Sequence, residues 1–474
     1  MIRAGNKIDF TQGRITRNLL IFALPIIATN LLQVLYNAAD MMVVSLSSEA
    51  NAVGAVGVCG PFVNMIINIF IGFSTGSNVV IARHLGAKRM DEADRAIHTA
   101  VLMSLIFGFG GGAIGILLSR PILVLMGNSG NVLELALRYT LIYFLGVPFI
   151  SLSNYLVSIY RAKGDSKTPF AVLSISGVLN VVLNLFFVLV LGLSVEGVAI
   201  ATVLANAFSA GVFLVKLHRL DELGIRFRKL KIDRRAFREI IYIGLPSGIQ
   251  GALFSISNMM ISSSIIKLND IMTPDPSLSP VLNGNTAGAN LDGFVYTAMN
   301  SLAQATTTFI SQNYGAARPD RIRKGLYASF GLVAAIGLTM TAIVLIFRTQ
   351  LLSLYGIVDG ASGTADAIAF QTTEIRIYYV LVPYFLCGFM DVGACAIRAL
   401  GKSVTSSIIV LFGACLFRVL WVVFIFPMEM TLELLLLSYP VSWIITSVVA
   451  YIFAIVYLRR FERKVNNVQE AVAL

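Results

Sequence analysis

Charged side chains are scarce in this sequence. Only 13% of its 474 residues are Asp, Glu, Lys or Arg, whereas 57% are hydrophobic. The mean hydropathy is +0.81, and a chain of this composition has too little polar surface to fold as an ordinary water-soluble globule. The composition predicts an all-α membrane protein that crosses the bilayer many times.

Cysteine is also rare, with four copies in the chain. Cys59, Cys387, Cys395 and Cys415 all fall within apolar stretches and lack the spacing of zinc ligands. We therefore expect neither a disulfide framework nor a zinc site. We interpret the four thiols as small apolar groups that fill space between helices.

Long apolar stretches are what the sequence has instead. A hydrocarbon core about 30 Å thick needs about 20 apolar residues per spanning helix. Twelve stretches meet this length, at residues 16–44, 52–80, 93–119, 132–160, 167–191, 195–217, 237–266, 291–313, 324–347, 371–398, 404–426 and 431–458. The first stretch follows a polar segment and lacks a small-residue cleavage site, so we expect it to remain as a spanning helix.

The positive charges indicate the orientation of these helices. If the N-terminus is cytoplasmic, 30 of the 36 Lys and Arg residues lie in cytoplasmic segments or at the adjacent helix ends. The positive-inside rule then predicts a multi-pass protein of the plasma (inner) membrane with both termini in the cytoplasm. The net charge of +11 follows from this topology, so we expect membrane lipid, and no nucleic acid, as its partner.

The two halves of the chain resemble each other. FALPIIATNLLQVLYNAADMM at 22–42 resembles YIGLPSGIQGALFSISNMMIS at 242–262, and three shorter pairs follow in the same order. The offsets of the four matches are 221–237 residues, counted from Pro25 and Pro246 in the first pair. We predict two parallel six-helix repeats that form two lobes around a central cavity, with the substrate site between them. The predicted parts are an N-terminal lobe at 1–217, a basic cytoplasmic linker at 218–236, a C-terminal lobe at 237–460 and a cytoplasmic tail at 461–474.

Asp40 is a carboxylate inside the apolar run YNAADMMVVS. It shares one predicted helix face with Asn30, Gln33, Tyr36 and Asn37. A carboxylate within the membrane costs about 2.5–3.5 kcal/mol on insertion scales, so it usually faces a cavity or a partner. We expect Asp40 to be the coupling site of a transporter. The alternative is a position at the wet outer end of its helix, about 30 Å from the helix start.

Polar side chains also recur at helical spacing in the fifth and sixth predicted helices. Asn180 and Asn184 are four residues apart, as are Thr202 and Asn206. Their oxygens suit a site for a hard cation beside Asp40. The alternative is that they hold helices together through hydrogen bonds worth about 0.6 kcal/mol each.

The order of several short motifs resembles the multidrug and toxic compound extrusion (MATE) family. The motifs are the early Leu-Pro with later Asn and Asp in the first helix, an Arg-x-x-Gly signature after the fourth and tenth helices, GVAIAT at 197–202 and SQNYGA at 311–316. The resemblance covers residues 14–460. It implies twelve helices in two lobes and antiport of small amphipathic organic cations against sodium ions or protons, without another cofactor.

By this resemblance, Asp40, Asn180 and Thr202 fall on the cation-binding positions of the N-terminal lobe in some members. Asn184 departs from the pattern, because an Asp is expected there. One carboxylate with neutral oxygens suits sodium at least as well as a proton, so the coupling ion stays open. The predicted cation-coupling site, which would also hold sodium, consists of Asp40, Asn180, Asn184 and Thr202.

The second half of the chain has a different set of deep charges. Ile261 stands where Asp40 would be expected, while Asn258 is retained, so Asp391 is the candidate acid of this half. Arg418 lies in FGACLFRVLWVVF and needs a carboxylate or carbonyl partner, for which Asp391 is one candidate. The residues predicted to line the substrate cavity are Gln33, Tyr36, Asn37, Asn258 and Asp391.

Enzyme chemistry is not expected. GFSTG at 72–76 has the spacing of a hydrolase turn but lies inside a predicted helix, and all histidines map to the cytoplasmic side. A flippase for lipid-linked oligosaccharides is the closest alternative, although it would need basic groups for pyrophosphate and only Arg418 is deep. We expect a monomer, with an outer loop at 267–292 that is either a flap or a tolerated insertion.

Overall fold

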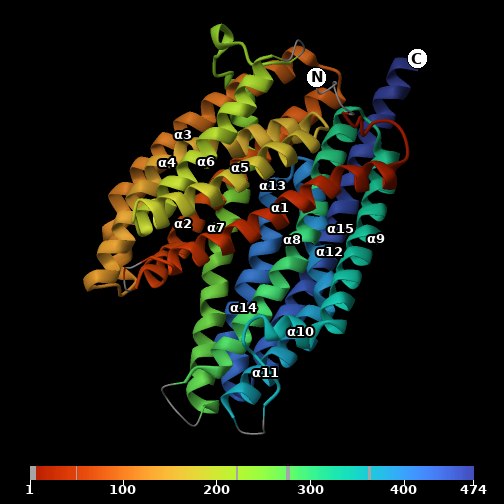
Figure 1. Cartoon of the computed structure of the whole chain (residues 1–474). Coiled ribbons are helices and arrows are strands. Elements are labelled where there is room, and N and C mark those ends of the chain that lie inside the picture. The colour runs from red at the N-terminus through yellow and green to blue at the C-terminus, as the bar shows by residue number, and fades with distance from the viewer. Residues whose placement is uncertain are drawn as a thin grey trace. The chain divides into compact units, whose positions relative to one another are not determined.

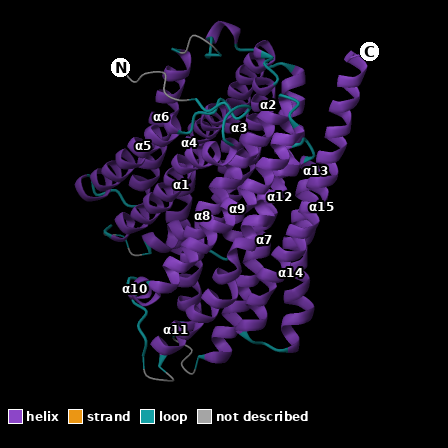
Figure 2. Ribbon diagram, turned by 90° about the vertical axis from the view of Figure 1, so that its right-hand side faces the viewer, coloured by secondary structure: helices purple, strands orange, loops and turns teal. Residues whose placement is uncertain are grey.

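The computed structural model describes residues 7–47, 49, 51–219, 223–273, 278–360 and 364–473. These residues form helices joined by short connections, and no strand occurs among them (Figure 2). The reason is physical, because a helix pairs nearly all of its backbone N–H and C=O groups within one segment and hydrocarbon offers them no other partner.

The first half of the chain forms six long helices (Figure 1). They are α1 (Ile15–Ser45), α2 (Ala52–Gly86), α3 (Met90–Leu125), α4 (Gly130–Ala162), α5 (Lys167–Leu185) with the π-helical η1 (Phe186–Val190), and α6 (Val195–His218). A single 3-10 turn, η2 (Phe227–Lys229), follows in the basic linker. Pro25 lies inside α1 and interrupts its hydrogen-bond ladder.

The second half is helical as well but more interrupted. It consists of α7 (Arg234–Met272), α8 (Pro280–Gly315), α9 (Pro319–Ile346), α10 (Arg348–Ser353), α11 (Ala365–Arg376), η3 (Ile377–Leu381), η4 (Val382–Tyr384), α12 (Phe385–Ala399), α13 (Ser403–Val410), η5 (Leu411–Leu416), α14 (Phe417–Leu420), η6 (Trp421–Ile425), η7 (Phe426–Met428) and α15 (Leu432–Ala473). Of the interruptions, η3, η5 and η6 are π-helical.

Eleven helical segments of the described chain are long and apolar enough to cross a membrane. The chain is therefore a multi-pass membrane protein. α8 has 36 residues, which is also a spanning length, but its sequence carries many Asn, Thr and Gln residues. The count of twelve spanning helices stays a prediction.

The long outer loop predicted at 267–292 is wrong. α7 continues into this segment and α8 begins within it. Two of the polar side chains that suggested a loop, Asn285 and Asp292, are buried and bind Arg376 of α11. Residues 274–277 lie outside the described chain.

The chain divides into two compact units. The first contains Met1–Arg14, Leu20–Ala252 and Ser311–Arg318, and the second contains Ile15–Leu19, Leu253–Ile310 and Pro319–Leu474. Each unit has its own buried apolar core, with Tyr155 and Phe213 in the first and Leu435 and Trp443 in the second. The division into two six-helix lobes stays a prediction.

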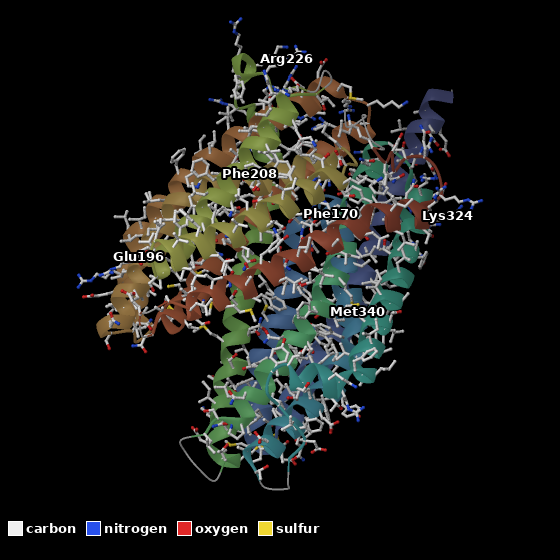
Figure 3. The ribbon with its side chains drawn as sticks, viewed as in Figure 1. Phe170, Glu196, Phe208, Arg226, Lys324 and Met340 are labelled. Carbon is white, nitrogen blue, oxygen red and sulfur yellow. The ribbon has the colours of Figure 1, made fainter. Side chains whose placement is uncertain are left out.

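Charged and apolar groups separate along the first unit. Figure 3 shows Glu196 and Arg226 at opposite ends of this unit, with Phe208 of α6 between them. Glu196 binds Arg138 at a distance of 3.2 Å, whereas Phe208 is exposed. An apolar exposed girdle between charged ends is the arrangement that a bilayer requires.

Candidate functional site

Asp40 lies in the last two turns of α1 and is half-buried in the first unit. Its Oδ1 accepts a hydrogen bond from Nδ2 of Asn184, which is fully buried on α5. The carboxylate therefore faces α5. This contact agrees with the cost of exposing an ionised acid to hydrocarbon.

The hydrogen bonds continue from Asn184 to α6. Asn184 Nδ2 lies 3.3 Å from Asn180 Oδ1, one helical turn away. Asn180 Nδ2 in turn lies 3.4 Å from Thr202 Oγ1. The structure thus brings together all four residues of the predicted coupling site in one polar chain across α1, α5 and α6. Asn206 binds the backbone oxygen of Thr202 at 2.9 Å and supports the helix.

One oxygen among these four hydrogen-bonded side chains receives no hydrogen bond from the described residues. Asn184 Oδ1 is buried and finds no partner among the described residues. Hard cations prefer oxygen ligands, and this site offers a buried amide oxygen beside a carboxylate. The described residues contain no group of three or more His, Cys, Asp or Glu that could hold a metal, so a cation here would bind one carboxylate and neutral oxygens.

The other polar residues of α1 divide into two kinds. Tyr36 points into the first unit, where its hydroxyl donates to the backbone oxygen of Ser174 at 3.2 Å. Gly177 of α5 makes room for this ring, because a Cβ at that position would overlap it. Gln33 and Asn37 are exposed. That Gln33 and Asn37 line the substrate cavity stays a prediction.

Asp391 of α12 lies in a second polar cluster, within the second unit. Its Oδ2 accepts a hydrogen bond of 3.2 Å from Asn300 Nδ2 of α8. Gln304 donates to Asn300 Oδ1 at 2.8 Å. Asn258 is exposed on α7 and Ile261 is buried. The sequence interpretation missed Asn300 and Gln304, although their four-residue spacing in a predicted helix was the same signal as in α5.

The pairing of Arg418 with Asp391, which the sequence left open, is not formed. Arg418 Nε donates to Ser442 Oγ at 3.0 Å, and its guanidinium lies 4.3 Å from the centre of the Tyr439 ring. Aromatic side chains occupy the faces of the guanidinium, while Asn300 holds Asp391. Asp391 is therefore not locked by Arg418.

A buried ion pair was also missed. Arg376 Nε binds Asp292 Oδ2 at 2.8 Å, and Arg376 Nη1 binds Asn285 Oδ1 at 2.6 Å. Both charged side chains are less than a tenth exposed. An arginine in a predicted spanning helix was the available signal, because such a charge requires a buried partner.

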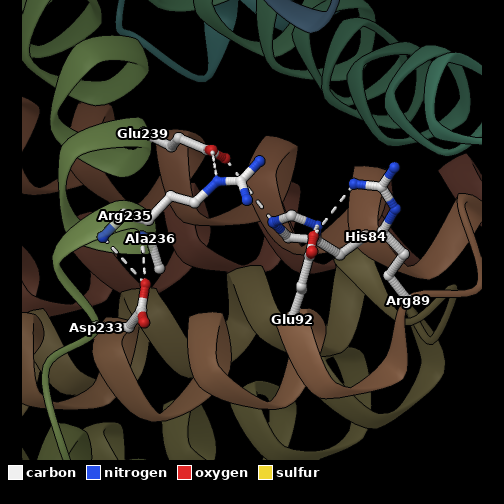
Figure 4. A network of polar contacts seen from close by, with 7 residues as sticks. All are labelled: His84, Arg89, Glu92, Asp233, Arg235, Ala236 and Glu239. Carbon is white, nitrogen blue, oxygen red and sulfur yellow. Dashed lines mark hydrogen bonds and ion pairs between the residues drawn. The ribbon is translucent and has the colours of Figure 1, made fainter.

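A polar network joins α2, α3 and α7 at the predicted cytoplasmic end of the first unit (Figure 4). His84 Nδ1 lies 2.9 Å from Glu92, and His84 Nε2 lies 3.8 Å from Glu239. Arg235 binds Glu239 at 3.2 Å, and Asp233 Oδ1 accepts the backbone N–H of Arg235. These contacts attach the start of α7 to α2 and α3.

Glycines allow α2 and α8 to approach closely near this network. A Cβ at Gly86 would overlap the backbone oxygen of Gln312, and a Cβ at Gly315 would overlap the backbone oxygen of Arg83. Gly86 and Gly315 occupy equivalent places in IARHLGAKR and ISQNYGAAR. The two helices therefore meet backbone to backbone at these two glycines.

Comparison with known proteins identifies the family. The MatE family model matches residues 25–186 and 246–424, more than half of the chain. Probable multidrug resistance protein YpnP of Bacillus subtilis (strain 168) is 26% identical over 83% of this chain and 84% of its own. A FAD transporter of Shewanella oneidensis is 22% identical over 79% of this chain and 80% of its own.

A solved structure shares the fold. It is the outward-facing conformation of a multidrug resistance MATE family transporter of the MOP superfamily, with a TM-score of 0.86 at 20% identity. The alignment covers 97% of this chain and 99% of that one. With the family match over most of a helical multi-pass chain, this protein belongs to the MatE family of membrane transporters.

Proposed function

We propose that this protein exports amphipathic organic cations by secondary active transport, in exchange for sodium ions or protons. The observation that supports this proposal most strongly is the chain of hydrogen bonds from Asp40 through Asn184 and Asn180 to Thr202. It combines the carboxylate of Asp40 with the buried Asn184 Oδ1, which receives no hydrogen bond from the described residues. A relative named as a probable multidrug resistance protein supports the export of drugs.

The coupling step starts at the bond between Asn184 and Asp40. A sodium ion that binds the carboxylate and the free Asn184 oxygen competes with this bond, and a proton on Asp40 weakens it by removing the charge. Either change alters how the end of α1 is held against α5. α1 has a place to bend, because Pro25 cannot donate a backbone hydrogen bond and Thr29 Oγ1 binds the Pro25 oxygen at 2.7 Å.

Bending of α1 then reduces the space for the organic cation and releases it outside. In this scheme two six-helix lobes alternate between an outward-open and an inward-open cavity, in a monomer of the plasma membrane with cytoplasmic termini. Gln33, Tyr36 and Asn37 line the cavity from one lobe, and Asn258 and Asp391 from the other. The negative charges of Asp40 and Asp391 attract a cationic substrate.

The driving force is a concentration gradient. One charge that crosses 100 mV is worth about 2.3 kcal/mol, but exchange of one monovalent cation for another moves no net charge. The membrane potential therefore adds nothing to such an exchange. The free energy comes from the sodium or proton gradient alone.

The test is uptake of a fluorescent cationic dye into everted vesicles, under separately imposed proton and sodium gradients. We expect the wild type to accumulate dye with one of the gradients and Asp40→Asn to remain at background. Glu196→Gln is the matched control, because it also removes a carboxylate of the first unit, at the ion pair with Arg138. It should transport like the wild type.

Two results would contradict the proposal. Equal uptake by Asp40→Asn and the wild type would remove Asp40 from coupling and make Asp391 the candidate. No dye uptake by the wild type under any gradient, at normal expression, would favour the lipid-linked oligosaccharide flippase.

A further inference from the structure

Arg418 is a deeply buried charge, and its hydrogen-bond and ring partners in the described chain are not charged. Its side chain is 1% exposed. Three rings surround its guanidinium carbon, with centres 4.3 Å away for Tyr439, 5.5 Å for Phe254 and 5.7 Å for Trp443. All of these residues belong to the second unit.

The hydrogen bonds of Arg418 are incomplete. Nε donates to Ser442 Oγ, and this hydroxyl donates its own proton to the Tyr439 backbone oxygen at 2.7 Å. Nη2 is buried and finds no acceptor among the described residues. A guanidinium does not lose its proton in a protein, so a full positive charge with an unused donor lies in the interior.

Arg376 is a second buried arginine of this unit, and its partners differ from those of Arg418. It also contacts the Tyr439 ring, at 5.7 Å from the ring centre, but it binds Asp292 and Asn285 directly. Two guanidinium groups thus contact one ring, and only one of them has a carboxylate within ion-pair distance in the described chain. Arg418, the other guanidinium of this cluster, forms no ion pair with an acid of the described chain.

The backbone around Arg418 is unusual in the same place. The π-helical segments η5 and η6 directly precede and follow the single turn α14 that carries it. Such segments in α-helices occur frequently at functional sites. The irregular backbone and the unpaired guanidinium are independent observations at one position.

We propose that Arg418 is the centre of an anion-binding site in the second unit. The Nη2 group donates to the anion, and the three aromatic rings keep water from screening the pair. A water molecule alone would accept the hydrogen bond but would leave the charge uncompensated. This site does not depend on the cation exchange proposed above, because it lies in the other unit and uses a charge of opposite sign.

The anion has one of two sources with the same chemistry. It is either a resident inorganic ion such as chloride, or the carboxylate or phosphate group of a transported molecule. Both offer a negative acceptor to a buried guanidinium donor. The nearly complete burial of Arg418 requires that the acceptor be small.

Thermal unfolding of the purified protein in detergent tests this site without a transport step. Chloride, acetate and phosphate are titrated against a bulky sulfonate at constant ionic strength. We expect at least one small anion to raise the unfolding temperature of the wild type saturably. Arg418→Met should lose this dependence and should match or exceed the wild type when only the sulfonate is present, because the uncompensated charge is gone.

Arg348→Gln is the matched control, since Arg348 is partly exposed and binds Glu374 at 3.1 Å. It should keep the full anion effect. Stabilisation by chloride assigns a resident ion, and stabilisation by acetate or phosphate alone assigns an anionic group of the cargo. The proposal is wrong if none of the three stabilises the wild type beyond the sulfonate, or if Arg418→Met keeps the effect. Arg418→Lys, which retains the charge, should keep part of it.

Discussion

Single residues carry the coupling chemistry in this account. Asp40 supplies the one charge of its site, and Asn184, Asn180 and Thr202 supply neutral oxygens from two further helices. Each neutral group can be removed without deleting the acid. The contribution of each to cation binding is therefore separately measurable.

Removal of a neutral oxygen should weaken the coupling cation without abolishing transport. We expect Asn180→Ala and Thr202→Ala each to raise the sodium or proton concentration for half-maximal dye uptake by about tenfold, since a hydrogen bond or ligand to a charged group is worth about 1.5 kcal/mol. Asn206→Ala is the control, because Asn206 binds only a backbone oxygen. A tenfold effect in this control as well would indicate general damage to α6.

Lys163 should make stability depend on pH. Burial in the connection between α4 and α5 lowers the pKa of this amine from 10.5 to about 8, and its Nζ donates to the Leu223 backbone oxygen at 3.0 Å. Between pH 8 and 10.5 the folded protein therefore holds fewer protons here than the unfolded chain. Stability at this site rises with pH over that window, and below pH 8 the burial cost of the charge applies in full.

The unfolding temperatures of wild type and Lys163→Met, measured from pH 7 to pH 10, check this dependence. The wild type should gain stability relative to the variant as the pH increases above 8, by at most about 1.4 kcal/mol per pH unit. The exposed Lys167 gives the control variant Lys167→Met. A difference between wild type and Lys163→Met that stays constant with pH would contradict the assignment.

Sequence patterns predicted some of the contacts between single residues and missed others. The helical spacing of Asn180 and Asn184, together with the resemblance to a family, led to the residues that the structure brings next to Asp40. The surroundings of Arg418 were not predictable, because Ser442 and Tyr439 lie more than twenty residues away and carry no motif. Contacts between distant helices depend on packing, which periodicity does not encode.

Whole helices are positioned by small residues as much as by polar ones. α2 crosses α8 at Gly86 and Gly315, and Gly72 and Gly76 of α2 lie against Gly244 of α7, where a Cβ would clash with backbone. Small residues allow helices in membranes to approach closely. The network around His84 in Figure 4 stabilises the same end of the first unit.

Alanine substitutions should separate contact glycines from others. Gly86→Ala should lower the free energy of unfolding by about 1–3 kcal/mol, because its Cβ would overlap the Gln312 backbone. Gly211→Ala, at an exposed position within α6 where an added Cβ would contact nothing, should raise it by about 0.5–1 kcal/mol. Unfolding temperatures in detergent measure both changes. Equal effects of the two substitutions would argue against close contact at Gly86.

The prediction of helix boundaries was wrong where polar residues lie inside the protein. The starting turns of α8 contain Asn283, Asn285, Asn290 and Asp292, which hydropathy interprets as a loop. Asn285 and Asp292 lie in a helix because Arg376, which is 91 and 84 residues away in the chain respectively, binds both of them. Apolar spans such as α1 and α6 were predicted well because most of their residues are apolar and the membrane sets their length.

The whole molecule should work as an electroneutral exchanger. If one monovalent ion enters for each monovalent dye that leaves, a potassium diffusion potential without a sodium or proton gradient should not drive dye uptake into vesicles. Collapse of the ion gradient should abolish uptake even when the potential is maintained. Uptake driven by the potential alone would require net movement of charge and would contradict a one-for-one exchange.

The central claim is that a cation bound at Asp40 releases the organic cation. The most direct measurement is fluorescence polarisation of a cationic dye bound to the purified protein, while sodium is added or the pH is lowered. The wild type should release dye with at least one of the two ions. Asp40→Asn, with dye bound, should release it with neither, and Glu196→Gln should behave like the wild type. Release of dye by Asp40→Asn at the same ion concentration as the wild type would contradict the account.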